Sequence, residues 1–313
     1  MIELDRLATE GRNDATLHID EMSALDMMKA IHAEDEKALR AVEAILPDIA
    51  RAVEEIAGRL RGGGRLLYCG AGTSGRLGVL DAAECPPTFG TPPELVVGLI
   101  AGGREAMFRA REGAEDDESR GAADLAAHGL SPEDAVVGLS ASGRTPYVVG
   151  ALRFAREIGA FRIAVASSPG SPIAALSDIA LEAETGPEAV TGSTRMKAGT
   201  AQKLILNMLS TGAMIRLGKV YGNLMVDVMA TNEKLAERAR RIVMAATGRT
   251  REECIAALEE ADGSAKLAIL LLLRGLPKEE ARRRLDDAEG YLARALAGPK
   301  GDAPQDTDES QGG

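Results

Sequence analysis

The chain has no tryptophan, and its 313 residues include only four phenylalanines and four tyrosines. Proteins that bind single-stranded nucleic acid stack its bases on aromatic side chains, and this sequence has few. Its formal net charge is −11, which opposes binding to a phosphate backbone or an acidic membrane surface. We therefore expect neither nucleic acid nor membrane as a partner.

Cysteine is also scarce: Cys69, Cys85 and Cys254 lie far apart in the sequence. They match neither a disulfide framework nor a metal-binding motif, and the three histidines have no metal-ligand spacing, so no metal site is expected. The longest apolar run, 267–273, is far shorter than the roughly 20 residues that span a bilayer. The first residues do not resemble a signal peptide. We expect a cytoplasmic protein.

In the middle of the chain, short apolar runs alternate with helical patterns. Such alternation predicts an α/β fold with a five-stranded, mostly parallel sheet flanked by helices. The expected strands are 65–69, 95–100, 135–139, 161–166 and 178–182, and the expected helices lie near 74–84, 104–112, 118–127, 146–158 and 171–176.

Helical patterns also precede and follow this predicted sheet. Residues 23–60 predict helix with a break after Leu46, because Pro47 follows. The all-round apolar pattern of 198–217 predicts a buried helix. With the apolar stripe of 39–60, it offers more buried surface than one sheet needs, so we expect a homodimer. After Gly248, four short helices are expected near 250–260, 264–273, 277–287 and 289–297.

These patterns divide the chain into five predicted parts. They are an N-terminal helical segment, a ligand-binding sheet domain, a linking helix, a small helical domain and a disordered acidic tail. Their bounds are 1–56, 57–220, 221–247, 248–298 and 299–313.

A glycine-rich turn follows the first predicted strand, with Gly72, Thr73 and Ser74 at its centre. Glycines allow close approach to a ligand, and a helix start beyond them would favour an anion. The spacing also matches the dinucleotide-binding Gly-x-Gly-x-x-Gly motif. That motif needs an acidic residue at the end of the second strand, whereas this strand is followed by Ala101-Gly102-Gly103. A small phosphorylated ligand is therefore the better hypothesis.

A second hydroxyl-rich turn follows the third predicted strand and contains Ser140, Ser142, Gly143 and Thr145. Serine and threonine are also common as helix caps, so one such turn alone leaves the two interpretations equal. Two such turns on one parallel sheet favour a phosphate site, because the carboxyl ends of parallel strands share one edge.

Four motifs resemble a known family, and they stand at 9–13, 70–81, 84–90 and 186–203. The two turns resemble those of the sugar isomerase (SIS) fold, which binds phosphosugars. The full set resembles the N-acetylmuramic acid 6-phosphate etherases, over roughly residues 8–297. Glucokinase regulatory protein shares parts of these motifs, so a regulator remains open as an alternative.

The resemblance implies cleavage of the lactyl ether of N-acetylmuramate 6-phosphate, giving N-acetylglucosamine 6-phosphate and D-lactate by elimination and then hydration. It implies no cofactor and a phosphosugar as the small-molecule substrate. Such chemistry needs a base near C2 and an acid near the C3 oxygen, and two carboxyl groups in different environments suffice. A phosphosugar isomerase, which also removes a C2 proton, is a third alternative.

The resemblance places the two catalytic carboxylates at Glu84 and Glu115. Cys85-Pro86-Pro87 is expected to end a helix at Glu84. A buried carboxyl at the negative end of a helix would hold its proton, as an acid for the departing lactate must. Glu115 would then act on the C2 proton, although the roles could be exchanged. The alternatives are an exposed surface glutamate for the first and a solvated acidic loop, with Glu112 as a rival, for the second.

The motif at 186–203 supplies the remaining candidates for substrate binding. Arg195 or Lys197 could hold the lactyl carboxylate or the phosphate. Equally, both could cap the following helix or contact a second subunit. Glu188 and Ser193, in the same loop, complete the predicted set.

Overall fold

The computed structural model describes residues 10–228 and 233–298. Contacts between residues divide these into two compact units. Unit 1 comprises Met1–Pro86 and Thr91–Ala213, and unit 2 comprises Pro87–Gly90 and Met214–Gly313, within the described ranges. This grouping does not test the five-part division predicted from the sequence.

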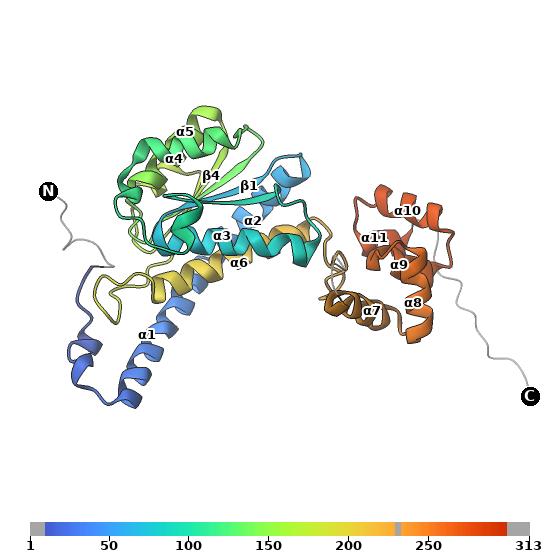
Figure 1. Ribbon diagram of the computed structural model, residues 1–313, viewed down its shortest axis with the longest axis horizontal. Coiled ribbons are helices and arrows are strands. Elements are labelled where there is room, and N and C mark those ends of the chain that lie inside the picture. Colours follow the sequence, from blue (N-terminus) through green and yellow to red (C-terminus); the bar gives the residue numbers. More distant parts are fainter. Residues whose placement is uncertain (1–9, 229–232, 299–313) are drawn as a thin grey trace, which may run out of the picture. The chain divides into compact units, whose positions relative to one another are not determined.

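Unit 1 is built on a five-stranded sheet in which every neighbouring pair is parallel. The order is β2-β1-β3-β4-β5, which confirms the predicted fold class (Figure 1). Each strand starts within one residue of its predicted start. The bounds are β1 Leu66–Gly70, β2 Val96–Ile100, β3 Ala135–Leu139, β4 Phe161–Ala166 and β5 Ile179–Glu182.

Helices cover both faces of this sheet (Figure 1). Leu67 and Cys69 of β1 pack into a core with residues of α4 and α5. Tyr68 lies between them and points to the opposite face, because side chains alternate along a strand. There its phenol donates a hydrogen bond to α3. The bounds are α3 Gly72–Phe89, α4 Glu118–Ala127, α5 Pro146–Ile158 and α6 Lys197–Arg216.

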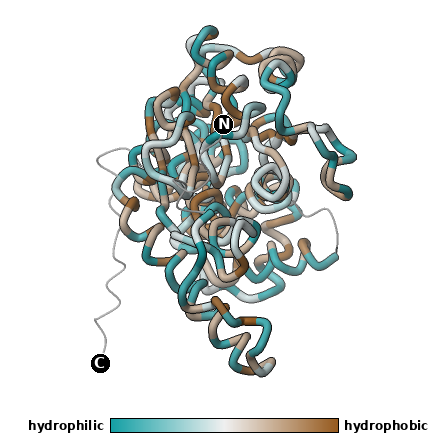
Figure 2. Tube along the Cα trace, turned by 90° about the vertical axis from the view of Figure 1, so that its left-hand side faces the viewer, coloured by the Kyte–Doolittle hydropathy of each residue, from teal (hydrophilic) through white to brown (hydrophobic). Residues whose placement is uncertain are grey.

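The N-terminal helical pattern forms two helices separated at Ile45, one residue from the predicted break. Pro47 lies in the first turn of the second helix, where its missing N–H has no intrahelical partner to lose. In Figure 2, hydrophilic and hydrophobic residues alternate at short intervals along the trace, as expected where elements carry one polar and one apolar face. The bounds are η2 Asp14–Thr16, η3 Ile19–Glu21, α1 Ala24–Ala44 and α2 Leu46–Arg61.

Three details of the sequence-based assignment are wrong. The segments 104–112 and 171–176 contain only short 3₁₀ turns. In the first segment only Ala106 is buried, so an α-helix there would lack the packed apolar face that stabilises short helices in proteins. These turns are η4 Arg104–Met107 and η6 Ala174–Leu176, and a further 3₁₀ turn, η5, spans Ala114–Asp116. In addition, α3 does not stop at Glu84 but continues through Pro86 and Pro87 to Phe89. Proline has a helical φ angle, and here its missing donors affect only the last turns of the helix.

Unit 2 is helical, and α9 lies at the centre of its core, with seven of its residues buried. Thr250 and Ser264 cap the helices that follow them through their side-chain oxygens. The bounds are α7 Glu233–Thr247, α8 Arg251–Glu260, α9 Ala265–Arg274, α10 Lys278–Asp287 and α11 Leu292–Ala297. Within the described ranges, no helix has both the length and the apolarity needed to cross a membrane.

A pair of glycine-to-alanine substitutions tests how tightly α3 packs on the sheet. A Cβ on Gly75 would lie 2.6 Å from the carbonyl oxygen of Gly70 and 2.7 Å from Ile100. Gly75→Ala should therefore lower the free energy of unfolding by about 1–3 kcal/mol or more. Urea denaturation measures the change.

Gly58 of α2 is the matched control, because a Cβ there meets nothing within 4 Å. Gly58→Ala should raise the free energy of unfolding by about 0.5–1 kcal/mol. Equal effects at the two positions would contradict the packing argument.

Candidate active site

The two hydroxyl-rich turns lie side by side because β1 and β3 are neighbours in the sheet. The chain leaves β1 for β2 on one side and returns to β3 on the other, so the strand order reverses between them. Ligands of open α/β sheets bind at such a reversal, outside the carboxyl ends of the strands. Two helices, α3 and α5, also begin there, and their free N–H groups favour an anion.

The first turn is possible only because glycine stands at two of its positions. A Cβ on Gly70 would lie 2.7 Å from the backbone nitrogen of Gly75, so any side chain there would force the start of α3 away from β1. Gly72 has a φ of +51°, opens α3 and is exposed. Thr73 is half-buried and Ser74 is buried. The turn thus brings backbone and hydroxyl groups close to the edge of the sheet.

The second turn holds its hydroxyls in a connected set. Ser140 Oγ lies 2.8 Å from Thr145 Oγ1 and 3.4 Å from Ser142 Oγ. Thr145 is the N-cap residue of α5, yet its side chain makes no capping hydrogen bond. The capping interpretation therefore does not account for Thr145, whose hydroxyl contacts Ser140 instead. Gly143, at φ +68°, packs against Ser171, where a Cβ would lie 2.2 Å from the serine Cβ.

A cavity of about 210 Å³ opens beside the first turn. Gly72 lines it together with Glu115, which belongs to the short turn η5 after Gly113. Its rival Glu112 lines the same cavity, so geometry alone does not separate the two. Both are exposed side chains that could meet a ligand.

Two arginines of this cavity were not predicted from the sequence. Arg76 Nε donates to the carbonyl of Met107, and Arg111 Nη1 donates to the carbonyl of Gly102. These bonds hold the 101–115 segment around the cavity and leave other guanidinium donors to meet an anionic ligand. The sequence could have indicated Arg76 as a cavity residue, because it lies four residues after Gly72 and hence on the same face of α3.

Glu84 does not line this cavity. It lies twelve residues after Gly72 on α3, which corresponds to about 18 Å of helix. Its side chain is exposed, and the helix continues beyond it. The expectation of a buried carboxyl at the end of the helix was therefore wrong on both counts. One protomer does not bring the two predicted catalytic carboxylates together in this cavity.

Three residues before Glu84, Asp81 fixes α3 in place. Its buried carboxylate accepts hydrogen bonds from Tyr68, Asn207 and Ser210, at 2.9, 2.7 and 3.2 Å. Burial raises the pKa of Asp81, and this effect exceeds the lowering by the three donors. The contacts join β1, α3 and α6, so this carboxylate sets where Glu84 lies relative to the sheet.

Glu188 and Lys197, predicted to bind substrate, are both buried in the structure. Glu188 accepts hydrogen bonds from the backbone N–H groups of Lys197 and Ala198, at the start of α6. Burial raises the pKa of Glu188 despite these bonds. Lys197 Nζ lies 2.5 Å from Glu34 Oε2 of α1. Glu188 thus caps the start of α6, and Lys197 makes its contact within the same chain. The alternatives expected for Lys197 were helix capping and a contact with a second subunit, and substrate binding by the two residues stays a prediction.

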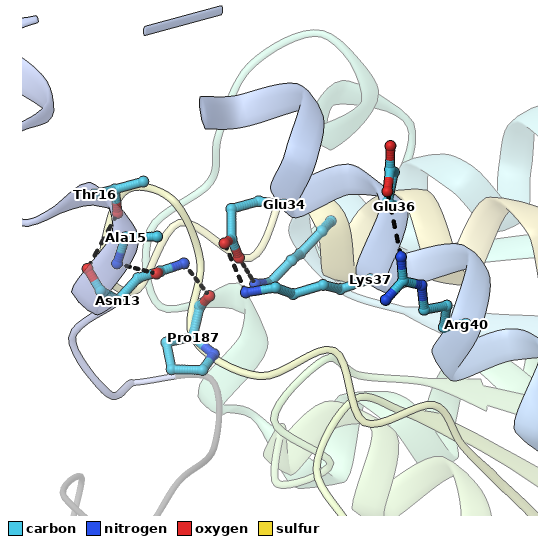
Figure 3. A network of polar contacts seen from close by, with 9 residues as sticks. Asn13, Ala15, Thr16, Glu34, Glu36, Lys37, Arg40 and Pro187 are labelled. Atoms are coloured by element: carbon cyan, nitrogen blue, oxygen red, sulfur yellow. Dashed lines mark hydrogen bonds and ion pairs between the residues drawn. The ribbon is translucent and has the colours of Figure 1, made fainter. Parts of the chain in front are cut away.

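Figure 3 shows the polar network around Glu34. The second oxygen of its carboxylate accepts a hydrogen bond from Lys37 at 2.6 Å. Burial alone would raise the pKa of Glu34, but hydrogen bonds from Lys197, Lys37 and Asn13 lower it. Asn13 also donates to the carbonyl of Pro187 at 3.1 Å. The motif near the N-terminus therefore contacts the 186–203 motif, although its first residue, Thr9, lies outside the described residues.

The remaining loop candidates lie at the surface. Ser193 is half-buried and Arg195 is exposed. The start of α6 lies near the first turn, since a Cβ on Gly199 would be 3.6 Å from Thr73. Within the described residues, no group of three or more His, Cys, Asp or Glu could hold a metal ion.

The comparison with known proteins agrees with this geometry. The model "Glucokinase regulatory protein N-terminal SIS domain" matches residues 48–156, and the SIS domain model matches residues 119–212. Both models describe SIS domains, so the sheet domain of this chain is of the SIS type.

Curated relatives narrow the class further. An N-acetylmuramic acid 6-phosphate etherase of Clostridium beijerinckii is 56% identical over 295 residues, covering 94% of this chain and 97% of that protein. One of Symbiobacterium thermophilum is 60% identical over 275 residues, covering 88% and 91%. The chain belongs to the N-acetylmuramic acid 6-phosphate etherase family.

Among solved structures, a phosphosugar isomerase of Bacteroides fragilis, described as putative, is 23% identical, with a TM-score of 0.48. The match covers 68% of this chain and 96% of that one. This distant likeness adds nothing about the reaction.

Replacing Lys197 tests whether its role is structural. Lys197→Met leaves Glu34 buried with only the half-exposed Lys37 as a charged partner. We expect a loss of about 3 kcal/mol in the free energy of unfolding, near the lower end for a broken buried pair. Urea denaturation at pH 7 measures it.

The double variant Glu34→Leu, Lys197→Met removes both charges and should recover most of that loss. The lowered pKa of Glu34 means that the pair stabilises the fold above the unfolded-state pKa, and that this stability disappears as the pH falls through the folded-state pKa. The difference between wild type and Lys197→Met should shrink accordingly on acidification. No recovery in the double variant would contradict the structural role.

Proposed function

We propose that the protein is a lyase that cleaves the lactyl ether of N-acetylmuramate 6-phosphate in amino-sugar recycling from peptidoglycan. The close relatives carry this activity in their names, at 56–60% identity over most of the chain. The single observation that carries the proposal is the pairing of two hydroxyl-rich turns at the β1/β3 reversal with a cavity that contains Glu115. This arrangement suits a phosphorylated sugar, and it needs no cofactor for the chemistry.

The phosphate would lie between the first residues of α3 and α5, held by Thr73 and Ser74 on one side and by Ser140, Ser142 and Thr145 on the other. Hydroxyls and helix N–H groups bind an anion without a lysine. The sugar would then extend toward the cavity beside Gly72. Arg195 is an exposed cation that could pair with the lactyl carboxylate.

The reaction would begin from the open-chain aldehyde, which makes the C2 proton acidic. Glu115 removes that proton, and the electron pair forms the C2–C3 double bond while the C3–O bond breaks. The departing lactate oxygen takes a proton from Glu84. Water then adds to C3, giving up a proton to the carboxylate of Glu84, and C2 regains its proton. The sum is substrate plus water giving N-acetylglucosamine 6-phosphate plus D-lactate.

We propose further that Glu84 reaches this site from a second subunit. Within one chain, it lies about 18 Å along α3 from the glycine that lines the cavity. Because Asp81 ties α3 to α6, a local shift does not close this gap. A homodimer in which each protomer presents Glu84 to the cavity of its partner would supply both carboxylates. We place this dimer in the cytoplasm, where phosphorylated sugars are metabolised.

Two inactive variants can test this arrangement. Glu84→Gln and Glu115→Gln should each reduce D-lactate release by about 10²–10⁴-fold, because each removes an acid–base group. When the two purified variants are unfolded together and refolded as a mixture, mixed dimers contain one site with both carboxylates. Activity should then rise well above that of either variant refolded alone, in a coupled D-lactate assay.

Glu112→Gln is the matched control, since Glu112 lines the same cavity and should be dispensable. No gain on mixing would contradict the shared site. Full activity in either single variant would contradict the role of that residue. A ketose phosphate formed without lactate would indicate an isomerase, and phosphosugar binding without turnover would indicate a sensor.

The shared site also makes a prediction about size. The protein should sediment as a dimer at micromolar concentration, because each cavity depends on a second chain. Analytical ultracentrifugation measures the mass directly. A monomer that still releases D-lactate at the full rate would refute the shared site.

A further inference from the structure

Three buried hydroxyl groups at one edge of the sheet have no hydrogen-bond partner among the described residues. They belong to Ser167 and Ser168, which follow β4, and to Thr185, which lies just after β5. At most 5% of the surface of each residue is exposed. A buried hydroxyl without a partner loses its hydrogen bonds to water and gains nothing in return, so each such group requires an explanation.

These hydroxyls lie next to the second hydroxyl-rich turn. The backbone N–H of Ser167 donates to the carbonyl of Ala141 at 2.9 Å, inside the Ser140–Thr145 turn. The N–H of Ala183 donates in the same way to the carbonyl of Ala166 at 2.9 Å, which brings the end of β5 beside the end of β4. The three groups therefore continue the hydroxyl-rich edge of the sheet beyond this second turn.

The neighbouring hydroxyls show that partners are available to side chains of the same kind. Ser140 and Thr145 bond to each other, Ser171 Oγ accepts from the N–H of Ala174, and Ser177 Oγ donates to the carbonyl of Ile173. Of the hydroxyl groups in this region, only those of Ser167, Ser168 and Thr185, closest to the ends of β4 and β5, have no hydrogen-bond partner among the described residues. Rotation about one bond redirects a serine hydroxyl, so these groups can turn toward a ligand at low cost.

The surroundings favour a neutral ligand group over an anion. Glu182, at the end of β5, accepts hydrogen bonds from the backbone N–H groups of Gly170 and Ser171, which places a carboxylate against the loop that follows β4. The helix after β4 is the three-residue turn η6, so this loop lacks the aligned N–H groups that follow β1 and β3. The carboxylate of Glu182 would repel a second phosphate or a carboxylate at this place. Within the described residues, no helix start is present there to attract one.

We propose that Ser167, Ser168 and Thr185 form a subsite that binds the neutral polar groups of the sugar, its amide or its hydroxyls. The proposal rests on the proposed function, because the phosphate must occupy the adjacent turns for the sugar to reach this edge. Two turns then hold the charge of the ligand, and the ends of β4 and β5 hold its uncharged groups.

Calorimetric titration with three ligands tests the subsite in the intact protein. N-acetylglucosamine 6-phosphate carries phosphate, amide and hydroxyls, glucose 6-phosphate lacks the amide, and inorganic phosphate lacks the sugar. The variant Ser167→Ala, Ser168→Ala should bind N-acetylglucosamine 6-phosphate about 10-fold more weakly, as expected for lost hydrogen bonds. It should bind inorganic phosphate as the wild type does. Thr185→Val, which keeps the side-chain shape, should act in the same direction.

The response to glucose 6-phosphate identifies the group that is bound. If the subsite holds the amide, the variants bind glucose 6-phosphate as well as the wild type does. If it holds ring or open-chain hydroxyls, both sugars lose affinity alike. Either result supports the proposal. Unchanged binding of both sugars, or an equal loss with inorganic phosphate, overturns it.

Ser177→Ala is the matched control, because its hydroxyl already has a partner. It should lower the melting temperature and leave binding unchanged, whereas the serine variants of the subsite should melt at the wild-type temperature or above. D-lactate release by the wild type is measured in parallel. If the wild type releases D-lactate but the variants bind the sugars as the wild type does, the subsite is rejected and the proposed reaction stands. If the wild type releases no D-lactate, the proposed reaction is rejected.

Discussion

The close approach of α3 to the end of β1 is the constraint on which the site depends. Gly70 and Gly75 meet backbone to backbone, and a single added methyl group on either would collide with the other. This contact places the start of α3 beside the start of α5, because β1 and β3 are neighbours. Two sets of free backbone N–H groups and several hydroxyls then lie at one edge of the sheet, which is where a phosphorylated ligand is favoured.

Contacts between distant segments fix the surroundings of this edge. The buried carboxylate of Asp81 holds α3 on α6, and the pair of Glu34 and Lys197 holds α1 on the start of α6. Both are polar contacts in poorly solvated places, where a lost partner is costly. The 186–203 motif therefore contains residues that shape the loop, and Arg195 remains the exposed cation within it.

Much of the fold could be predicted from sequence patterns. The five strands follow from short apolar runs bounded by glycine and serine turns, and the long helices follow from the spacing of apolar residues. The errors occur where little apolar surface is buried and where proline stands near the end of a helix. Only Ala106 of segment 104–112 is buried, so no packed face stabilises an α-helix there, and α3 tolerates Pro86 and Pro87 in its last turns. For the site, the hydroxyl-rich turns were found from sequence, whereas the cavity arginines Arg76 and Arg111 were not.

By itself, the sequence determined the turns and the order of the elements, because these depend on local residue types and periodicity. Only the tertiary structure decided which residues share a cavity. It placed Glu115 beside Gly72 and left Glu84 farther along α3, and it buried Lys197 against a helix more than 150 positions away in the chain. Spacing along a chain sets distance only within one element, whereas packing between elements sets the rest.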